Sequence, residues 1–381
     1  MKKLLIVYAK NRYEILNRKS AIGSYIFCLA EILNKNCDVY INGISIETIK
    51  QINTIAPSRI KSKAIRIPLF FKLFVKDLIS IYQIVLLYFK INEKEIKYDA
   101  IIEFYTLYSF IGLNLSKRQK TPLIFVFDGP ILEEYKYFNG RNPIFKRYAI
   151  YLQKKSLRRS KKVIAYSASV KNYISAQFRI NLEKIEIHQN IDFTRFRFYP
   201  IYEDNSSINI GFIGSFLKWH RVDLLIKAFQ VLKIQNYPVT LYLIGHGMEY
   251  DSIKKVIDTN NIQDVIMPGF LDGDALEEYK KIIHIGVMPS SNWYGAPNKL
   301  FEYGAAHMAV VAPKTPTISD IFVDSENIIL FENNSYEDLL SKLTILCDNT
   351  VLRRNIADNL FEKIKLEHSC DNTLNFYNTL I

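Results

Sequence analysis

Short apolar runs of strand length alternate along this chain with amphipathic segments of helix length, and the alternation appears in two successive series. The strand-like runs of the first series extend from Leu4–Tyr8 to Val163–Tyr166, and those of the second from Asn209–Ile213 to Val310–Ala312. Buried strands that alternate with helices indicate parallel sheets covered by helices on both faces. The sequence therefore predicts an α/β fold with two doubly wound parallel-sheet domains, which bind ligands at the carboxyl ends of their strands.

A length of 381 residues exceeds what one hydrophobic core supports, which also favours two domains. We expect the first in residues 1–200, the second in 201–365, and a last helical segment, 366–381, that packs back on the first domain. The expected strands are 4–8, 38–41, 100–103, 123–127, 163–166, 209–213, 240–244, 265–267, 285–288 and 310–312, and the expected helices include 24–34, 222–230, 251–259, 275–282 and 373–381. A Pro and a polar run between Phe196 and Ser207 mark the boundary.

The net charge of +12 is unevenly distributed between the two halves. Residues 1–200 contain 35 Lys and Arg against 15 Asp and Glu, whereas residues 201–381 contain 15 against 23, so the halves carry about +20 and −8. A basic half joined to an acidic half indicates one domain that faces an anionic surface, and an anionic membrane leaflet is the leading candidate. Nucleic acid is not expected as a partner, because no helix-turn-helix, zinc or RNP-type pattern occurs.

The 4 cysteines show no Cys-x-x-Cys spacing and no accompanying His cluster, so they support neither a zinc site nor a disulfide framework and fit a reducing cytoplasm. Residues 1–8 begin like a signal peptide, but the apolar run breaks at Lys10 and Asn11, which favours a first buried strand.

The longest apolar segment, 68–91, is interrupted by Lys72, Lys76 and Asp77. The uncharged stretch that remains, Leu78 to Phe89, is too short to span a bilayer. We expect an amphipathic helix there, either buried or docked on a surface, with its lysines available for lipid headgroups.

Three segments of the second half place glycines and cations between a strand and a helix: Gly211–Leu225, Leu241–Glu249 and Pro289–Gly304. Each alone also fits an ordinary strand–loop–helix joint. Glycines let the backbone approach a pyrophosphate, a helix N-terminus offers unpaired N–H groups, and Lys299 adds a point charge for phosphate oxygens. Glu302 can accept hydrogen bonds from ribose hydroxyls. Together these features are typical of a nucleotide-sugar site.

In this order the segments resemble the C-terminal half of the retaining GT-B glycosyltransferases of family 4, which build bacterial surface polysaccharides. The residues that carry the resemblance are Gly214–Leu225, the Gly-x-Gly turn 245–247, the strand end Met267–Phe270 and Pro289–Glu302, with a weaker likeness upstream at Tyr98–Ile102 and Asn190–Phe196. The resemblance implies that two Rossmann-like domains face each other across a cleft, which is the expected active site.

The resemblance also implies roles for individual residues. Glu302 matches the second glutamate of the family's E-x7-E motif, which holds the donor ribose, and Lys299 is the cation expected to neutralise the departing diphosphate. The other expected donor-binding residues are Gly214, Ser215, Lys218, His220, Arg221, Gly245, Gly247, Gly269, Phe270, Tyr294, Gly295, Pro297, Asn298 and Leu300.

The chain departs from the family pattern at three of these positions. The first glutamate of the motif falls at Tyr294, which cannot act as a carboxylate. The family's phosphate-binding Arg and Lys align with Ser215 and His220, and we expect Lys218 or Arg221 to substitute for them.

The acceptor side is expected in the first half. Gly23 and Ser24 lie where relatives often carry two glycines at the start of a helix. Asp128 follows a strand where many relatives carry a histidine near the reacting sugar, and we name it with Lys299 and Glu302 as a catalytic candidate. It could orient the sugar or the acceptor hydroxyl, and it could equally cap the following turn. Glu133 is a further acceptor-side candidate.

Residues 154–162 contain six cations. At helical spacing Lys154, Arg158, Lys161 and Lys162 are expected near one face. Attraction to a membrane or a lipid diphosphate is favoured over a merely solvated helix end.

The sequence thus predicts a hexosyltransferase that moves a sugar from a nucleoside diphosphate sugar to a lipid-linked or polysaccharide acceptor, at the cytoplasmic face of the membrane. The resemblance implies retention of the anomeric configuration, and the scheme requires neither a metal nor a cofactor. One alternative is a UDP-sugar 2-epimerase on the same scaffold, for which the 6 scattered histidines offer no cluster. The other is a non-catalytic, nucleotide-binding partner subunit, which the departures from the family pattern suggest.

Overall fold

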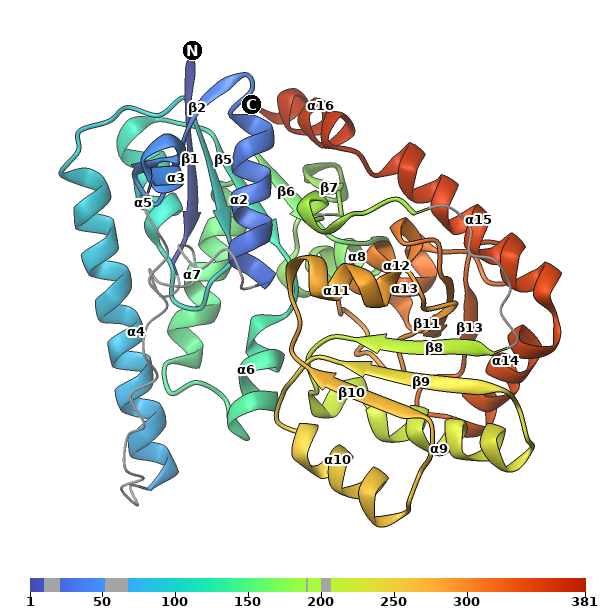
Figure 1. The fold of residues 1–381 in the computed structure, drawn as a ribbon. Coiled ribbons are helices and arrows are strands. Elements are labelled where there is room, and N and C mark those ends of the chain that lie inside the picture. Colours follow the sequence, from blue (N-terminus) through green and yellow to red (C-terminus); the bar gives the residue numbers. More distant parts are fainter. Residues whose placement is uncertain (10–20, 52–67, 190, 200–206) are drawn as a thin grey trace. The chain divides into compact units, whose positions relative to one another are not determined.

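The computed structural model describes residues 1–9, 21–51, 68–189, 191–199 and 207–381 (Figure 1). These residues form two compact units. Unit 1 consists of Met1–Thr194 and Cys370–Ile381, and unit 2 of Arg195–Ser369. Asn190 and residues 200–206, which the sequence analysis used for the motif and the boundary, lie outside the described residues.

Unit 1 is built on a seven-stranded sheet in the order β3-β2-β1-β4-β5-β6-β7, in which every neighbouring pair is parallel except β2 and β3. Its strands are β1 Lys2–Tyr8, β2 Cys37–Ile41, β3 Ile44–Ser45, β4 Ala100–Phe104, β5 Leu123–Phe127, β6 Lys162–Ala165 and β7 Ile185–Ile187. Its helices are α2 Ala21–Leu33, α3 Ile46–Gln51, α4 Leu69–Asn92, α5 Ile111–Gln119, α6 Ile131–Asn139, α7 Lys146–Arg159, α8 Ala168–Phe178 and α16 Cys370–Leu380.

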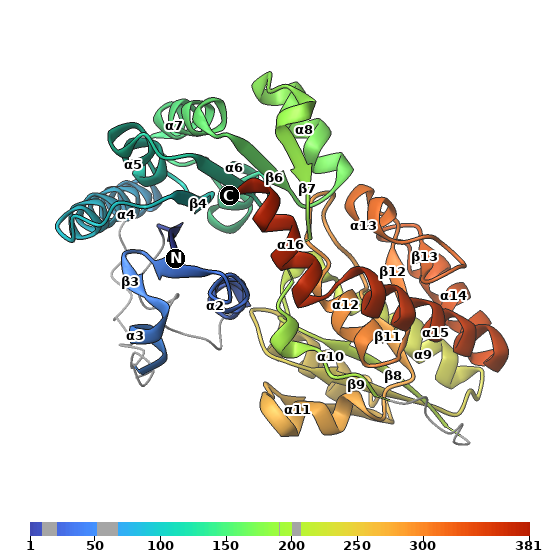
Figure 2. The same cartoon turned by 90° about the horizontal axis from the view of Figure 1, so that it is seen from above.

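Alternate residues of β1 enter two separate hydrophobic layers, as expected for a strand buried on both faces. Leu4 and Ile6 belong to a layer shared with α2 and α16, whereas Leu5 and Val7 belong to a layer shared with α4 and α5. Figure 2 shows α4, α5 and α7 on one side of this sheet and α2 on the other. The predicted doubly wound arrangement is confirmed for this unit.

Unit 2 is built on a six-stranded, wholly parallel sheet in the order β10-β9-β8-β11-β12-β13. Its strands are β8 Ile208–Ile213, β9 Val239–Ile244, β10 Val265–Gly269, β11 Ile285–Val287, β12 Ala309–Pro313 and β13 Ile329–Phe331. Its α-helices are α9 Val222–Ile234, α10 Tyr250–Thr259, α11 Gly273–Lys280, α12 Asn298–Ala305, α13 Pro316–Ile321, α14 Tyr336–Asp348 and α15 Thr350–Glu367. The order reverses at β8, which is the topological switch point where open α/β sheets bind ligands.

Helix α4 is amphipathic, as expected, and it is only partly covered. Leu73, Asp77, Ile84 and Ile91 are buried. The large apolar side chains that remain 40% to 62% exposed are Leu69, Phe70, Phe71, Val75, Leu78, Ile79, Tyr82, Leu86 and Phe89, and we call this set the α4 apolar face. Among the described residues, no helix has the length and hydropathy needed to cross a membrane.

The basic run that begins at Lys154 continues past the end of α7, which corrects the predicted helical face. Because α7 ends at Arg159, Lys161 lies in the following connection, where its Nζ donates to the Leu380 carbonyl oxygen (3.0 Å). Lys162 lies on β6.

Candidate functional site

The glycine turns of unit 2 meet at the carboxyl ends of β8, β9 and β10. The Gly214 N–H donates to the Ile244 carbonyl oxygen (2.9 Å), and the Gly245 N–H donates to the Gly269 carbonyl oxygen (2.8 Å). Gly245 has φ +133°, and a Cβ there would lie 1.9 Å from the Gly214 carbonyl oxygen. A Cβ on Gly247 would lie 2.6 Å from backbone atoms of Phe216. The turns therefore pack backbone against backbone, which only glycine allows.

Lys299, near the N-terminus of α12, reaches this group of turns. Its Nζ lies 3.1 Å from His220 Nδ1 and 4.6 Å from the centre of the Phe212 ring. A Cβ on Gly214 would lie 3.0 Å from the same Nζ. Two residues expected to bind the donor phosphates, Lys299 and His220, are thus brought into contact beside the first glycine turn.

Burial sets the protonation of this pair. It lowers the pKa of Lys299 to about 7, although Glu302 opposes the shift. Burial, assisted by the Lys299 charge, lowers the pKa of His220 to about 2. His220 is therefore neutral near pH 7, and its Nδ1 can accept a hydrogen bond from the Lys299 ammonium.

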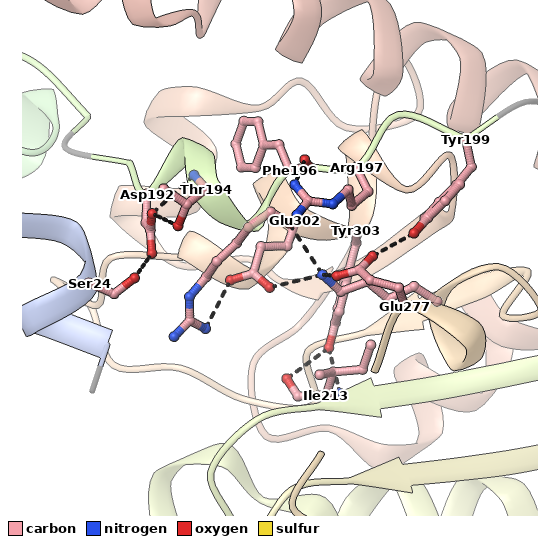
Figure 3. Close-up of polar contacts among 12 residues, drawn as sticks. Ser24, Asp192, Thr194, Phe196, Arg197, Tyr199, Ile213, Glu277, Glu302 and Tyr303 are labelled. Atoms are coloured by element: carbon pink, nitrogen blue, oxygen red, sulfur yellow. Dashed lines mark hydrogen bonds and ion pairs between the residues drawn. The ribbon is translucent and has the colours of Figure 1, made fainter. Parts of the chain in front are cut away.

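Glu302 lies between two cations of unit 2 (Figure 3). Its side chain is 14% exposed, with Oε1 3.5 Å from Arg195 Nη1 and Oε2 3.6 Å from Lys280 Nζ. Lys280 is itself 2% exposed, and its Nζ lies 3.1 Å from Glu277 Oε1. The carboxylate is held in a defined place by charges on two other segments.

Hydrogen bonds also fix the elements that carry these charges. The Tyr303 hydroxyl accepts from the Ile213 N–H (2.8 Å) and donates to the Ile213 carbonyl oxygen (3.2 Å), so it ties α12 to the end of β8 (Figure 3). The Tyr199 hydroxyl donates to Glu277 Oε2 (2.7 Å), and burial together with this contact raises the pKa of Tyr199.

Sequence reasoning missed Arg195 and Lys280. Arg195, at the start of unit 2, occupies an unspecified position of the weaker motif Asn190–Phe196. Lys280 is followed by Lys281, and two adjacent lysines usually indicate a helix end that is exposed to solvent. The available signal was the i,i+3 spacing from Glu277 to Lys280, which matches an ion pair on a helix.

The other donor-binding candidates are less enclosed. Ser215 and Lys218 are exposed, and Phe270 is 63% exposed. Arg221 turns to Asp223, with Nη2 2.8 Å from Oδ2.

The loop before α12 holds the remaining candidates. Tyr294 is half-buried, with its ring edge-on to that of Trp293. A Cβ on Gly295 would lie 2.7 Å from Ser291 Oγ. Pro297 precedes α12, Asn298 begins it, and Leu300, in its first turn, is fully buried.

The acceptor candidates lie in unit 1 and form two groups. Ser24 Oγ, on α2 beside the buried Gly23, donates to Asp192 Oδ2, and Asp192 Oδ1 accepts from the Thr194 hydroxyl (2.5 Å). Asp192, which the sequence indicates only as part of a weaker likeness, thus anchors Ser24.

The second group follows β5. Burial, and to a smaller extent the Asp128 carboxylate, raises the pKa values of Tyr166 and Tyr377. Asp128 therefore faces a tyrosine-rich environment. Glu133 lies in the first turn of α6, where it is exposed.

The acidic residues of the described segments form no cluster of three or more His, Cys, Asp or Glu side chains placed to hold a metal ion. Asp272 and Asp274 have Asp-x-Asp spacing at the start of α11, where carboxylates stabilise the positive end of the helix dipole.

Comparison with known families agrees with this geometry. Residues 200–363 match the model for Glycosyl transferases group 1, and residues 53–191 match the model for Glycosyltransferase Family 4. The chain belongs to the GT-B glycosyltransferases of family 4.

This glycosyltransferase has relatives in archaea and bacteria. It is 25% identical over 276 residues to an uncharacterised glycosyltransferase of Methanocaldococcus jannaschii, covering 71% of this chain and 72% of that one. It is 24% identical to the capsular polysaccharide biosynthesis glycosyltransferase CapM of Staphylococcus aureus, over 59% and 62% of the two chains. Its fold matches the crystal structure of Anabaena HepE in complex with UDP-glucose, with a TM-score of 0.69, 17% identity and coverage of 100% and 99%.

Proposed function

We propose that unit 2 binds a nucleoside diphosphate sugar, with UDP as the first nucleotide to test, and that the sugar is transferred to a lipid-linked or polysaccharide acceptor in cell-surface glycan synthesis. The observation that supports the donor site is the contact of Lys299 with the Gly214 turn. Lys299 lies on α12, the helix that also carries Glu302. The UDP-glucose complex of HepE and the capsular role in the name of CapM support the substrate classes.

Lys299 is the group that acts on the diphosphate in this scheme. The bond between the anomeric carbon and the diphosphate oxygen breaks while the acceptor oxygen bonds to the same carbon, on the same face of the sugar. The acceptor proton passes to the departing diphosphate. The Lys299 ammonium stabilises the negative charge that develops there, so we propose a retaining reaction that is independent of metal and of any cofactor.

Glu302 binds the ribose hydroxyls, and its two cationic neighbours position it. Lys280 and Arg195 restrict the orientation of the carboxylate, which lowers the entropy cost of binding the nucleotide. The glycines of these turns, which have no side chain, let the backbone approach the phosphates closely.

Unit 1 is proposed to bind the acceptor near Ser24, Asp128 and Glu133, and to associate peripherally with the inner face of the cell membrane. The α4 apolar face supports the membrane association. Lys72 is exposed beside this face, whereas Lys76 Nζ donates to Asn139 Oδ1 on α6 (2.8 Å). The helix has no acidic residue other than the buried Asp77. Apolar area and lysines on one helix are what an anionic membrane surface attracts.

Thermal unfolding with UDP, GDP, ADP, CMP and their sugar conjugates tests the donor site, because a ligand that binds only the folded state raises the melting temperature. Selective stabilisation by one nucleoside diphosphate is expected. The absence of stabilisation by every compound would contradict the proposal.

Glu302→Ala is expected to weaken binding of the stabilising nucleotide by about 1.5–3 kcal/mol, the scale of a hydrogen bond to a charged group. Isothermal titration measures the change, and Glu278→Ala, an exposed carboxylate on α11, is the matched control that should bind like the wild type. Equal affinity of Glu302→Ala and wild type would remove Glu302 from the site.

One alternative retains a specific observation in its favour. Tyr294 replaces a family carboxylate, and Ser215 and His220 replace two family cations, as expected of a nucleotide-binding subunit that has lost catalysis. Nucleotide binding without sugar transfer or donor hydrolysis would support that alternative, and either activity would reject it.

A further inference from the structure

Unit 1 contains a cavity of about 440 Å³ between α6, α7 and α8, and Glu133 is the acceptor-side candidate in its lining. Its size lies within the range of small-molecule sites. Three lysines line it: Lys136 on α6, and Lys146 and Lys154 on α7.

These lysines form no ion pair with any described residue. Glu133 is the one acidic residue of the lining, so the wall carries an excess of positive charge. Lys146 is also the first residue of α7, and Phe145 at the N-cap gives no side-chain hydrogen bond. A cation and an uncapped helix N-terminus at the same place both favour an anion there.

A second, independent observation indicates a ligand with hydroxyl groups. Gln153, on α7, lines the same cavity and is 3% exposed, yet its Oε1 has no hydrogen-bond partner among the described residues. An unpaired buried carbonyl oxygen is costly, and a ligand hydroxyl would satisfy it. Tyr173 and Phe178 of α8 add aromatic rings to the wall, which suit the apolar face of a sugar ring.

We propose that this cavity binds a sugar phosphate, with the phosphate at Lys146 and Lys154 and a sugar hydroxyl at Gln153. The inference rests on the proposed function, because the ligand would be the phosphate-bearing sugar end of the acceptor.

Calorimetric titration of the full chain with glucose 1-phosphate tests the proposal, with UDP present at saturation so that the donor site of unit 2 is occupied. Glucose 1-phosphate should bind, and both inorganic phosphate and glucose should bind at least about tenfold more weakly, because each lacks one of the two contacts. The absence of glucose 1-phosphate binding would overturn the proposal. The preceding titration with UDP alone reports on the donor site separately, so failure of the two ideas can be told apart.

Variants locate the site. Lys146→Ala combined with Lys154→Ala should weaken glucose 1-phosphate binding by about tenfold or more. Both side chains are exposed, so the fold is expected to tolerate the change. Lys155→Ala is the matched control, because Lys155 stacks on Tyr151 and lies outside the lining. Gln153→Leu should reduce the affinity for glucose 1-phosphate to that for inorganic phosphate. Equal binding by the double variant and the control would overturn the assignment.

A competition experiment separates two sources of the phosphate. Vesicles of phosphatidylglycerol should not displace glucose 1-phosphate if the sugar is part of the recognised ligand. Displacement by these vesicles, but not by phosphatidylcholine vesicles, would overturn the sugar assignment in favour of a lipid headgroup.

Discussion

Lys299 has both protonation states available near neutral pH, because burial lowers its pKa to about 7. A bound diphosphate would favour the ammonium and raise this pKa again. At pH 8 the Lys299 side chain of the ligand-free protein is largely neutral, so UDP binding is expected to take up a proton. The affinity for UDP should therefore fall as the pH rises above 7.

Titration calorimetry in buffers of different ionisation enthalpy measures this proton uptake. Lys299→Met should abolish the uptake at pH 8 and weaken binding most below pH 7, where the wild-type lysine is charged. Equal proton uptake by the wild type and Lys299→Met would assign it to another group.

Glu103 is a second buried titratable residue, in the core of unit 1. Burial raises its pKa to about 7, although the Ser109 hydroxyl, which donates to Oε1 (2.5 Å), opposes the shift. An unfolded glutamate loses its proton near pH 4.3. The stability of unit 1 should therefore fall as the pH rises from about 4.3 to about 7, since the unfolded state ionises first.

Glu103→Gln removes this titration and is expected to be more stable than the wild type at pH 8 by roughly 1–3 kcal/mol, with little gain at pH 4. Urea unfolding at the two pH values measures the difference. Glu47→Gln, at an exposed position of the same unit, should have no such effect. A Glu103→Gln variant with the pH dependence of the wild type would show that Glu103 ionises freely in the fold.

Single residues that belong to local motifs can be identified from the sequence, but the residues that contact them in the fold cannot. Lys299 and Glu302 could be named because a glycine, a cation and a carboxylate follow one another at fixed spacing where one helix begins. Lys280 and Arg195 could not, because their proximity to Glu302 depends on how separate segments pack. Glu103 lies within an apolar run, and nothing in that run reports the hydroxyl that holds it.

Among the secondary-structure elements, α4 shows most clearly how one charged residue can orient a helix. Asp77 accepts hydrogen bonds from the Tyr108 hydroxyl (2.8 Å), the Tyr135 hydroxyl (2.7 Å) and the Ile144 N–H (2.7 Å). This buried carboxylate fixes which side of α4 faces the unit. The α4 apolar face is consequently directed outward.

Phe71→Glu combined with Ile79→Glu should reduce cosedimentation with phosphatidylglycerol vesicles by about tenfold or more, because charged side chains replace apolar area that would enter the lipid interface. The UDP-induced rise in melting temperature should be unchanged. Ile234→Glu, at a position of α9 that is 78% exposed, is the matched control. Unaltered vesicle binding by the α4 variant would place membrane contact elsewhere.

The sequence predicted α4 from its apolar run, but the run could not indicate whether the helix is covered. In the sequence Asp77 interrupts the apolar segment, whereas in the structure its carboxylate holds the helix against unit 1. The end of α7 was missed for a related reason: the basic run continues through the helix end onto β6, and charge alone does not mark where a helix stops.

In the whole molecule, the two series of strands and helices were evident because parallel strands buried on both faces have nearly continuous apolar sequences. The terminal helix α16 supplies Tyr377 and Leu380 to the core of unit 1. Helical periodicity indicates such a segment, but not which of two cores it completes.

Tyr377→Ala should destabilise unit 1 by about 3–5 kcal/mol, the cost of removing a large buried aromatic side chain. The stabilisation of unit 2 by UDP should persist. Thermal unfolding with and without UDP measures both effects, and Phe376→Ala, next in sequence and only partly buried, should cost less. Loss of UDP stabilisation together with loss of unit 1 would show that the two units unfold as one.

Unit 1 contains both the first strand and the last helix, whereas unit 2 is one continuous stretch, Arg195–Ser369. During synthesis on the ribosome, N-terminal domains usually fold first. Here unit 2 is expected to complete its fold before unit 1. Unit 2 can finish once its own residues have emerged, but unit 1 must wait for residues 370–381. A polypeptide released before that point would carry a finished nucleotide-binding unit and an open apolar core, a product that chaperones and proteases can recognise.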